Sequence, residues 1–194
     1  MRSILKGLLK RAVCLKVFLD KITVAEEEST GPSQRSPDHA VTTMPQSLAR
    51  ICLHLVFSTK GRQPMLSDRA LRGEMHSFLG GLCKTLECPV VAVGGVEDHI
   101  HVACHLGRVI TVANLIKELK RESSAWIKSR SRFHSHFEWQ AGYGAFSVSP
   151  SHLPALIEYI ATQETHHQQE SFQDELRRIL RIYDIAWDER YLWD

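Results

Sequence analysis

The sequence predicts an α+β fold of the ferredoxin-like type, a split βαβ arrangement in the order βαββαβα around an antiparallel sheet. Two observations predict it. Segments rich in β-branched or aromatic residues, with turn residues at their ends, recur at 50–58, 90–106 and 137–149. Segments whose apolar residues recur with helical spacing follow them, at 67–87, 111–132 and 150–168. One helix is therefore expected after the last strand.

The first strand and the first helix are predicted from 50–58 and 67–87. The segment 50–58 (RICLHLVFS) alternates between apolar and polar residues, as a strand does when its two faces differ. A basic turn follows at 59–64. Ser67 and Asp68 can cap the helix, because their side-chain oxygens accept hydrogen bonds from free backbone N–H groups.

The second half of the pattern begins at 90–106, where two apolar arms flank Gly and Asp residues. We interpret this segment as two short strands joined by a tight turn. Thr111 can cap the helix at 111–132. The segment 137–149 is aromatic and punctuated by Gly, which indicates an irregular strand, and the helix at 150–168 follows it.

The two ends of the chain differ from its middle. In residues 1–43, apolar residues are interrupted by Lys and Arg and precede a Glu-, Ser- and Pro-rich stretch, which predicts a disordered or weakly structured extension. The predicted motif-bearing domain is 44–168. Residues 169–194 are predicted as a C-terminal tail with a polar helix at 173–183.

The totals are those of a globular protein with a sizeable core. The chain has 194 residues, 43% of them hydrophobic and 24% charged, and its net charge is only +2. Any contact with nucleic acid must therefore depend on where the charges lie. None of the 5 Cys forms a Cys-x-x-Cys pair, so we expect buried free thiols of a reducing compartment. No apolar run is long enough to span a membrane, and a membrane is therefore not predicted as a partner.

A local excess of basic residues lies in the helix at 111–132. Its usual explanation is a solvated helix face, but the excess also suits contacts to phosphates. Ser123, Ser124 and Trp126 lie among these charges and could contact phosphates and a base face. The predicted nucleic-acid contacts, including two from the basic turn, are Lys60, Arg62, Lys117, Lys120, Arg121 and Lys128.

His99 and His101 are the first candidates for a chemical role. They are two apart on a predicted strand, so both imidazoles point to one face while Ile100 and Val102 point to the other. Two adjacent imidazoles can form half of a divalent-metal site. The alternative is a pair of ordinary surface histidines on a half-buried strand.

Tyr159 and Gln163 are the second pair of candidates. They are one helical turn apart and fall on one flank of the apolar stripe of their helix, so a hydroxyl and an amide oxygen can both reach the sheet. The alternative is a packed interfacial tyrosine and a solvated glutamine.

These residues belong to motifs that resemble those of a known family. The run Glu97-Asp98-His99-Ile100-His101-Val102 resembles the HUH motif of single-tyrosine transposases of the insertion-sequence-200/605 class, and 159–163 resembles their catalytic segment. Residues 56–62 resemble the first strand and basic turn of that family, and 139–143 resembles its strand before the helix. The resemblance covers about 45–168, with the motifs in the family's order.

The resemblance implies a mechanism and a setting. Tyr159 would be the nucleophile that cleaves single-stranded DNA with hairpin ends and forms a 5′-phosphotyrosine. His99, His101 and Gln163 would hold Mg²⁺ or Mn²⁺. The protein would be a bacterial, cytoplasmic, nucleoid-associated homodimer. The rival nucleophiles are Tyr143, Tyr183 and Tyr191, and none of them has a carboxamide one turn on.

Two other functions remain open from the sequence. One is a domesticated relative that binds hairpin or single-stranded DNA without mobilising an element. The other is a zinc site formed by His99, His101, Cys104 and His105, for which Cys104 would have to leave its strand face through a bulge. A nucleotide hydrolase with a His-x-His-x-His motif is excluded, since Ala103 stands at the third histidine.

Overall fold

The computed structural model describes residues 48–193, and the described residues from Arg50 onwards form one compact unit. The extension predicted over 1–43 lies outside the described residues. None of the helices in the described part of the chain has the length and apolar character needed to cross a membrane.

Four antiparallel strands form the sheet, and their order confirms the predicted fold class. The strands lie side by side in the order β2-β3-β1-β4, and each neighbouring pair is antiparallel, which is the ferredoxin-like arrangement. Their bounds are Cys52–Ser58 for β1, Val90–Gly95 for β2, His99–His105 for β3 and Gly144–Val148 for β4.

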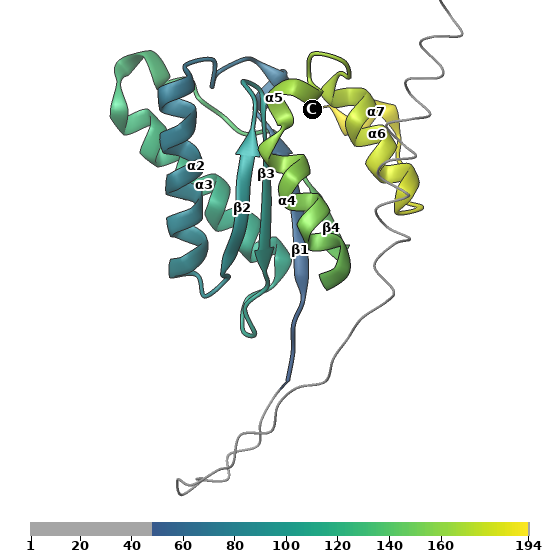
Figure 1. Cartoon of the computed structure of the whole chain (residues 1–194). Helices are drawn as coiled ribbons and strands as arrows, with labels where there is room; N and C mark the ends of the chain where they lie inside the picture. Colours follow the sequence, from purple (N-terminus) through teal and green to yellow (C-terminus); the bar gives the residue numbers. More distant parts are fainter. Residues whose placement is uncertain (1–47, 194) are drawn as a thin grey trace, which may run out of the picture. The chain divides into compact units, whose positions relative to one another are not determined.

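Helices cover both faces of this sheet (Figure 1). One face carries α2 (Arg69–Thr85) and α3 (Val112–Arg130). The other carries α4 (Leu153–Ala161) and α6 (Phe172–Ile182), with α5 (Gln163–His166) and α7 (Glu189–Leu192) near them. Short 3-10 turns are η1 (Lys60–Arg62), η2 (Arg132–His134) and η3 (Pro150–His152).

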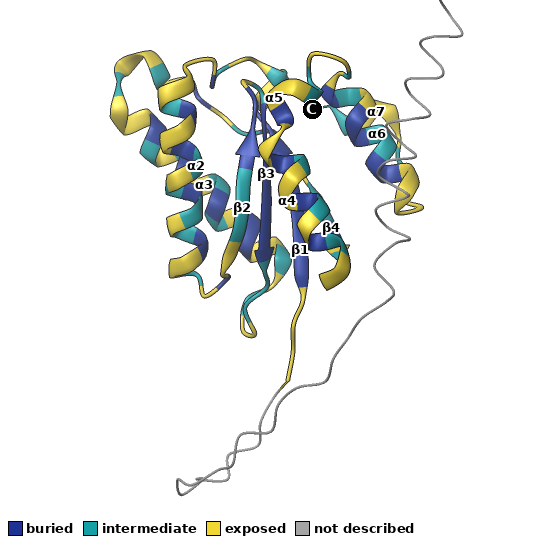
Figure 2. Ribbon diagram, in the orientation of Figure 1, coloured by how far each residue is buried: buried dark blue, intermediate teal, exposed yellow. Residues whose placement is uncertain are grey.

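The two faces of the central strand have different environments. Leu53, Leu55 and Phe57 of β1 face α2 and α3 and belong to the main apolar core. Val56 points the opposite way and packs in the cluster of α6. This is the period-two alternation of a strand, and Figure 2 shows β1 and β3 buried between helices whose outer surfaces are exposed.

The caps predicted from the sequence are present. The Asp68 carboxylate accepts hydrogen bonds from the backbone N–H groups of Ala70 and Leu71 at the start of α2. The Thr111 hydroxyl accepts one from the N–H of Asn114 at the start of α3. Both helices therefore begin where their free donors are satisfied.

Three predicted elements differ in detail. The helix expected at 150–168 is interrupted at Thr162, whose backbone departs from helical values at φ −102° and ψ 15°, so α4 and α5 are separate. The strand expected over 137–149 is regular only from 144, preceded by an isolated bridge between Thr59 and Trp139. The helix expected to be polar at 173–183 is α6, and it buries an apolar stripe.

Gly94 sets how closely α4 packs on β2. A Cβ atom at this position would lie 2.5 Å from the Ile160 carbonyl oxygen and 2.7 Å from its Cγ2. Gly94→Ala should therefore destabilise the fold by about 1–3 kcal/mol, the usual cost of overpacking. The measurement is the free energy of unfolding from urea titration.

Gly81→Ala on α2 is the matched control. No atom lies within 4 Å of a Cβ placed there, so this variant should gain about 0.5–1 kcal/mol from lower backbone entropy in the unfolded chain. Equal unfolding midpoints for the two variants would contradict the proposed contact between α4 and β2.

Candidate active site

His99 and His101 lie side by side on the face of β3 that looks toward α4 and α6. Both side chains are fully buried, and their ring centroids are 5.0 Å apart. The strand spacing predicted from the sequence therefore places both imidazoles on one face. They are not ordinary surface histidines.

The Nδ1 atom of each imidazole is already occupied. His99 Nδ1 lies 2.7 Å from an Asp98 carboxylate oxygen, which can only accept, so His99 carries its hydrogen on Nδ1. His101 Nδ1 lies 2.9 Å from Nε2 of His54, a buried residue of β1. These contacts orient both rings and leave Nε2 of each free for another partner.

His54 and His99 are held in the neutral form. Burial lowers the pKa of His54 to about 3, with a further contribution from the neighbouring His101. Burial also lowers the pKa of His99, and its contact with Asp98 opposes this only in part. A neutral imidazole with a free Nε2 lone pair is the form that binds a metal ion.

Glu175 of α6 is the residue that the sequence-based prediction missed. Its Oε1 lies 3.5 Å from His101 Nε2, and its Oε2 lies 3.6 Å from His99 Nε2. His167 Nε2 lies 3.2 Å from the same Oε2. Burial raises the pKa of Glu175, but the imidazoles of His101, His167 and His99 outweigh it and hold the pKa well below the usual range. Glu175 is therefore a buried carboxylate ion among imidazoles.

The apolar stripe of α6 places Glu175 in this position. Phe172, Leu176 and Ile179 of α6 are buried in a cluster with Val56 of the sheet. The Phe172 ring also stacks on His99, with centroids 4.2 Å apart. A carboxylate inside an apolar helical stripe is rarely buried unless it is paired, and this was the available sequence signal.

Tyr159 and Gln163 both reach the same carboxylate. The Tyr159 hydroxyl donates to Glu175 Oε1, and Gln163 Nε2 donates to that oxygen at 3.0 Å. Burial and the Glu175 charge raise the pKa of Tyr159 well above its ordinary value, while Arg178 opposes them. The four residues predicted from the sequence therefore converge on Glu175, with the Tyr159 ring centroid 5.9 Å from that of His101.

The donor atoms of this centre fit a divalent cation. Several buried polar atoms lack a hydrogen-bond partner, and in this centre they are His99 Nε2, His101 Nε2, Gln163 Oε1, His167 Nε2 and Glu175 Oε2. The ligand atoms of His99, His101 and Glu175 all lie within 4.8 Å of one another. Ligands bind a small cation at about 2.0–2.2 Å, so two ligands of one ion lie at most about 4.4 Å apart. The separations of 3.5 and 3.6 Å between the Glu175 oxygens and the two Nε2 atoms meet this limit.

The rival tyrosines lie outside this centre. Tyr143 is 48% exposed beside Lys120, Tyr191 is 71% exposed, and the Tyr183 hydroxyl donates to the Ser147 carbonyl at 2.6 Å. Among the described tyrosines, Tyr159 is the one whose hydroxyl bonds to Glu175, the carboxylate beside His99 and His101.

The zinc alternative is not assembled. Cys104 is buried in the core on the α2 and α3 face, opposite to His101, and its thiol lies against Cys83. His105 Nδ1 pairs with the Cys52 thiol at 3.2 Å. The four described cysteines, Cys52, Cys83, Cys88 and Cys104, are buried free thiols, as predicted.

The predicted DNA-contact residues divide into exposed and occupied groups. Lys117 and Lys128 are exposed on α3. Arg121 is also exposed and pairs with the neighbouring Glu118 and Glu122. On the basic turn, Lys60 Nζ pairs with Glu138 at 2.6 Å, and the Arg62 guanidinium lies 5.7 Å from the Trp193 ring.

Lys120 has a structural task. Its ammonium donates to the backbone carbonyls of Gln140, Ala141 and Gly142 at 2.8, 3.2 and 2.6 Å. Burial lowers its pKa to about 8. Lys120 therefore pins the loop before β4, and its charge is largely used within the protein.

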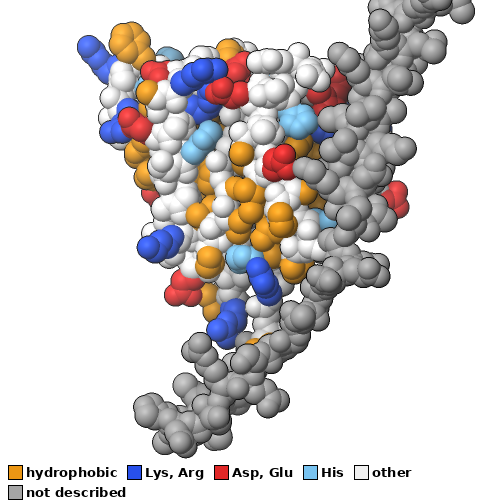
Figure 3. Space-filling view, in the orientation of Figure 1, with side chains coloured by type: hydrophobic (Ala, Val, Ile, Leu, Met, Phe, Trp, Pro, Cys, Tyr) orange, Lys and Arg blue, Asp and Glu red, His pale blue; other side chains and the backbone are white. Residues whose placement is uncertain are grey.

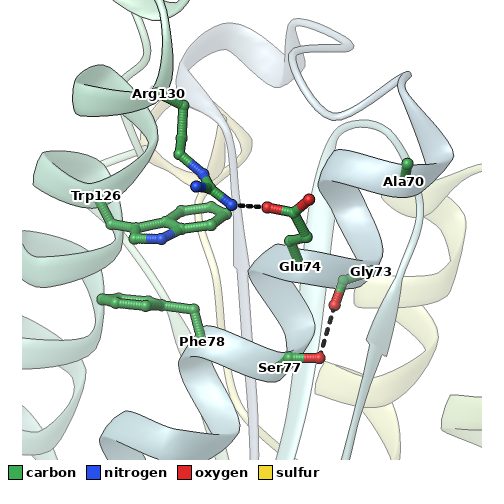
Figure 4. A pocket seen from close by; sticks show the side chains of 7 residues that line it. All are labelled: Ala70, Gly73, Glu74, Ser77, Phe78, Trp126 and Arg130. Carbon is green, nitrogen blue, oxygen red and sulfur yellow. Dashed lines mark hydrogen bonds and ion pairs between the residues drawn. The ribbon is translucent and has the colours of Figure 1, made fainter.

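Trp126 is similarly occupied, at a shallow groove of about 550 Å³ between α2 and α3 (Figure 4). Its ring stacks on Phe78 with centroids 5.1 Å apart, and the Arg130 guanidinium covers the other face at 5.0 Å. Arg130 in turn pairs with Glu74. Ser123 is buried and accepts from the Trp139 indole. For Trp126 to stack on a base as predicted, Phe78 or Arg130 would have to leave the face of its ring.

Comparison with known proteins identifies the family. The family model described as "Transposase IS200 like" matches residues 47–163. Among solved structures, the chain is similar to a candidate transposase from Deinococcus radiodurans R1, at 22% identity and a TM-score of 0.48, over 63% of this chain and 98% of that chain. It is also similar to a REP-associated tyrosine transposase bound to a REP hairpin, at 12% identity and a TM-score of 0.48, over 76% and 93%. Among curated proteins, none matches significantly. The match over most of the described fold shows that this chain belongs to the IS200-like transposase family.

Proposed function

We propose that this chain is an HUH-type single-tyrosine transposase that cleaves and rejoins single-stranded DNA through a 5′-phosphotyrosine on Tyr159. The observation that supports it is the convergence of Tyr159, His99, His101 and Gln163 on one buried carboxylate, Glu175. Family membership supports the transposase role, and the geometry supports the assignment of the residues.

His99, His101 and Gln163 hold Mg²⁺ or Mn²⁺ in this proposal, with Oε2 of Glu175 as a further ligand. The free Nε2 atoms of the two histidines and the unpartnered oxygens of Gln163 and Glu175 support it. A bound divalent cation polarises a phosphoryl oxygen and stabilises the charge that develops on it.

The chain's own residues carry out the exchange. Tyr159 Oη attacks the phosphorus, an oxygen–phosphorus bond forms, and the bond to the 3′ oxygen breaks. The hydroxyl proton passes to Glu175 Oε1, which already accepts its hydrogen bond, and the leaving 3′ oxygen takes a proton from water. Rejoining reverses these steps and needs no nucleotide cofactor, because the phosphotyrosine keeps the bond energy.

The proposed substrate is single-stranded DNA with hairpin ends, which the resemblance in the four motifs implies. Lys60, Arg62, Lys117, Lys120, Arg121 and Lys128 are the proposed contacts. Lys117, Arg121 and Lys128 are the exposed members on α3 and are the ones that a variant can test, because replacing Lys120 would also release the loop that it pins.

The triple variant Lys117→Gln, Arg121→Gln, Lys128→Gln should bind DNA with a weaker salt dependence. Each lost phosphate contact to a single strand lowers the slope of log affinity against log salt by about 0.7, so three contacts lower it by about 2. Fluorescence anisotropy over a NaCl series measures the slope. Lys84→Gln, outside the proposed set, should leave it unchanged, and an unchanged slope in the triple variant would refute the assignment.

The proposed assembly is a homodimer. Within the described part of the chain, β2 is an edge strand whose outer side pairs with no other strand, and Val90 of β2 and Ile157 of α4 are 36% and 38% exposed. Figure 3 shows apolar side chains gathered over the middle of this face, with charged groups toward its rim. Sedimentation equilibrium gives the mass, and a monomer at micromolar concentration would contradict the dimer.

The proposed location is the bacterial cytoplasm, in association with the nucleoid, where the DNA substrate lies. Imaging of a fluorescent fusion against a DNA stain tests it, and exclusion from the nucleoid would contradict it.

The experiment that tests the function uses labelled single-stranded DNA from the flanks of the protein's own gene, with Mg²⁺ or Mn²⁺. A covalent protein–DNA adduct that survives denaturing electrophoresis is the expected result. Binding of the same DNA without an adduct, in either metal, would favour the domesticated binding protein instead.

A further inference from the structure

Arg178 of α6 lies at the hydroxyl of Tyr159. Its Nη2 atom is 3.3 Å from the Tyr159 oxygen, and its guanidinium carbon lies 5.9 Å from the ring centroid. Arg178 stands three residues after Glu175, so the two side chains share one face of α6. The helix therefore presents a carboxylate and a guanidinium to the same oxygen.

A second carboxylate holds the Arg178 guanidinium in place. Arg178 Nε and Nη2 donate to the two oxygens of Glu170 at 3.2 and 2.9 Å, a two-pronged ion pair. Nη2 is thus shared between Glu170 and the Tyr159 hydroxyl. This pair fixes the plane of the guanidinium, and its side chains remain partly accessible, at 27% for Arg178 and 30% for Glu170.

The exposure of the groups around the hydroxyl gives the direction of approach. The Glu175 side chain is 2% exposed, whereas the Arg178 side chain is 27% exposed. A group arriving from solvent therefore reaches the Tyr159 oxygen along the Arg178 side. Because Arg178 Nη2 lies 3.3 Å from that oxygen, a phosphate that meets the Tyr159 oxygen also comes within reach of the guanidinium.

We propose that Arg178 is a catalytic residue that binds the non-bridging oxygens of the phosphate attacked by Tyr159 and remains on them in the phosphotyrosine. This inference rests on the proposed function. The bonds that form and break are those of the tyrosine attack, and Arg178 transfers no proton. Its fixed positive charge stabilises the negative charge that develops on the phosphate oxygens.

Arg177 provides a matched control on the same helix. It is adjacent in sequence and similarly exposed, at 25%, but it pairs with Glu189 at 2.7 Å and contacts neither Tyr159 nor Glu170 in any described hydrogen bond or ion pair. A general effect of removing positive charge from α6 would appear equally in Arg177→Gln and Arg178→Gln.

The first measurement is the rate of covalent adduct formation with labelled single-stranded DNA. Arg178→Gln should slow it by about 10²–10³-fold, the usual effect of removing one charge-stabilising donor. Arg178→Lys, which keeps the charge and loses the fork, should fall between, and Arg177→Gln should stay within about 2-fold of the wild type. Circular dichroism and the thermal midpoint establish that each variant is folded.

The second measurement is the binding of inorganic phosphate to the full-length, metal-free protein by isothermal titration calorimetry. Arg178→Gln should bind phosphate at least about 10-fold more weakly than Arg177→Gln, and Glu170→Gln should bind it more tightly, because it releases the guanidinium. This measurement needs no catalysis, so it separates the two proposals.

The outcomes are distinct. A wild type that binds phosphate through Arg178 but forms no adduct would refute the proposed reaction and keep the phosphate site. An Arg178→Gln variant that forms the adduct at the wild-type rate, or that binds phosphate as Arg177→Gln does, would overturn the role of Arg178 and leave the function intact.

Discussion

Tyr159→Phe should form no covalent adduct with single-stranded DNA, although it folds and binds the DNA as the wild type does. The substitution removes one oxygen and keeps the ring, which packs 6.4 Å from the His54 ring and 5.9 Å from the His101 ring. Losing the nucleophile removes the covalent route altogether, so adduct should fall to background. Denaturing electrophoresis of labelled DNA measures the adduct, and anisotropy measures binding.

Tyr143→Phe is the control for this experiment. Tyr143 is exposed and lies beside Lys120, away from the histidine cluster, so its hydroxyl should be dispensable. An adduct that persists in Tyr159→Phe and disappears in Tyr143→Phe would place the nucleophile in the loop before β4. Tyr159→Phe should also change the free energy of unfolding by about 1–3 kcal/mol, because this variant lacks the hydroxyl that donates to Glu175.

His99→Ala or His101→Ala should lower metal-dependent adduct formation by about 10³-fold, which corresponds to the several kcal/mol that a bound cation contributes to phosphoryl transfer. Each variant removes one free Nε2 from the cluster around Glu175. The wild type should also gain thermal stability from Mn²⁺, because a ligand that binds only the folded state stabilises it, and both variants should lose that gain.

His105→Ala is the control for the metal variants. His105 ends the same strand but pairs with Cys52, so Mn²⁺ should stabilise this variant as it does the wild type. Loss of metal binding in His105→Ala as well as in His99→Ala would favour the zinc alternative. Full activity of the wild type in a chelator would remove the metal role.

The local patterns of the sequence were enough to predict the sheet and the half of the site that His99 and His101 form. The two-residue spacing of His99 and His101 places both imidazoles on one strand face whatever packs above them, and the structure confirms this. The alternating strands and capped helices were predictable for the same reason, since each pattern depends on residues close in the chain.

The missed features depend on distant contacts. Glu175 enters the site because the apolar stripe of α6 packs on Val56 of β1. The residue pattern within α6 does not predict the face of the sheet on which this helix packs. Lys120 belongs to a basic helix by sequence, but the backbone carbonyls of 140–142 fold back to occupy its ammonium. In both cases the partner lies in a segment remote from the residue.

The position of α6 after all four strands has a consequence for protein synthesis. His99, His101 and Tyr159 leave the ribosome before α6, so a nascent chain ending near residue 168 can pair its four strands while Val56 and Phe146 still lack their cover from Phe172 and Leu176. A message truncated there would yield a chain with an exposed apolar sheet face, which is a substrate for chaperones, proteases and aggregation. The chain therefore buries that face of the sheet only after α6 has been made.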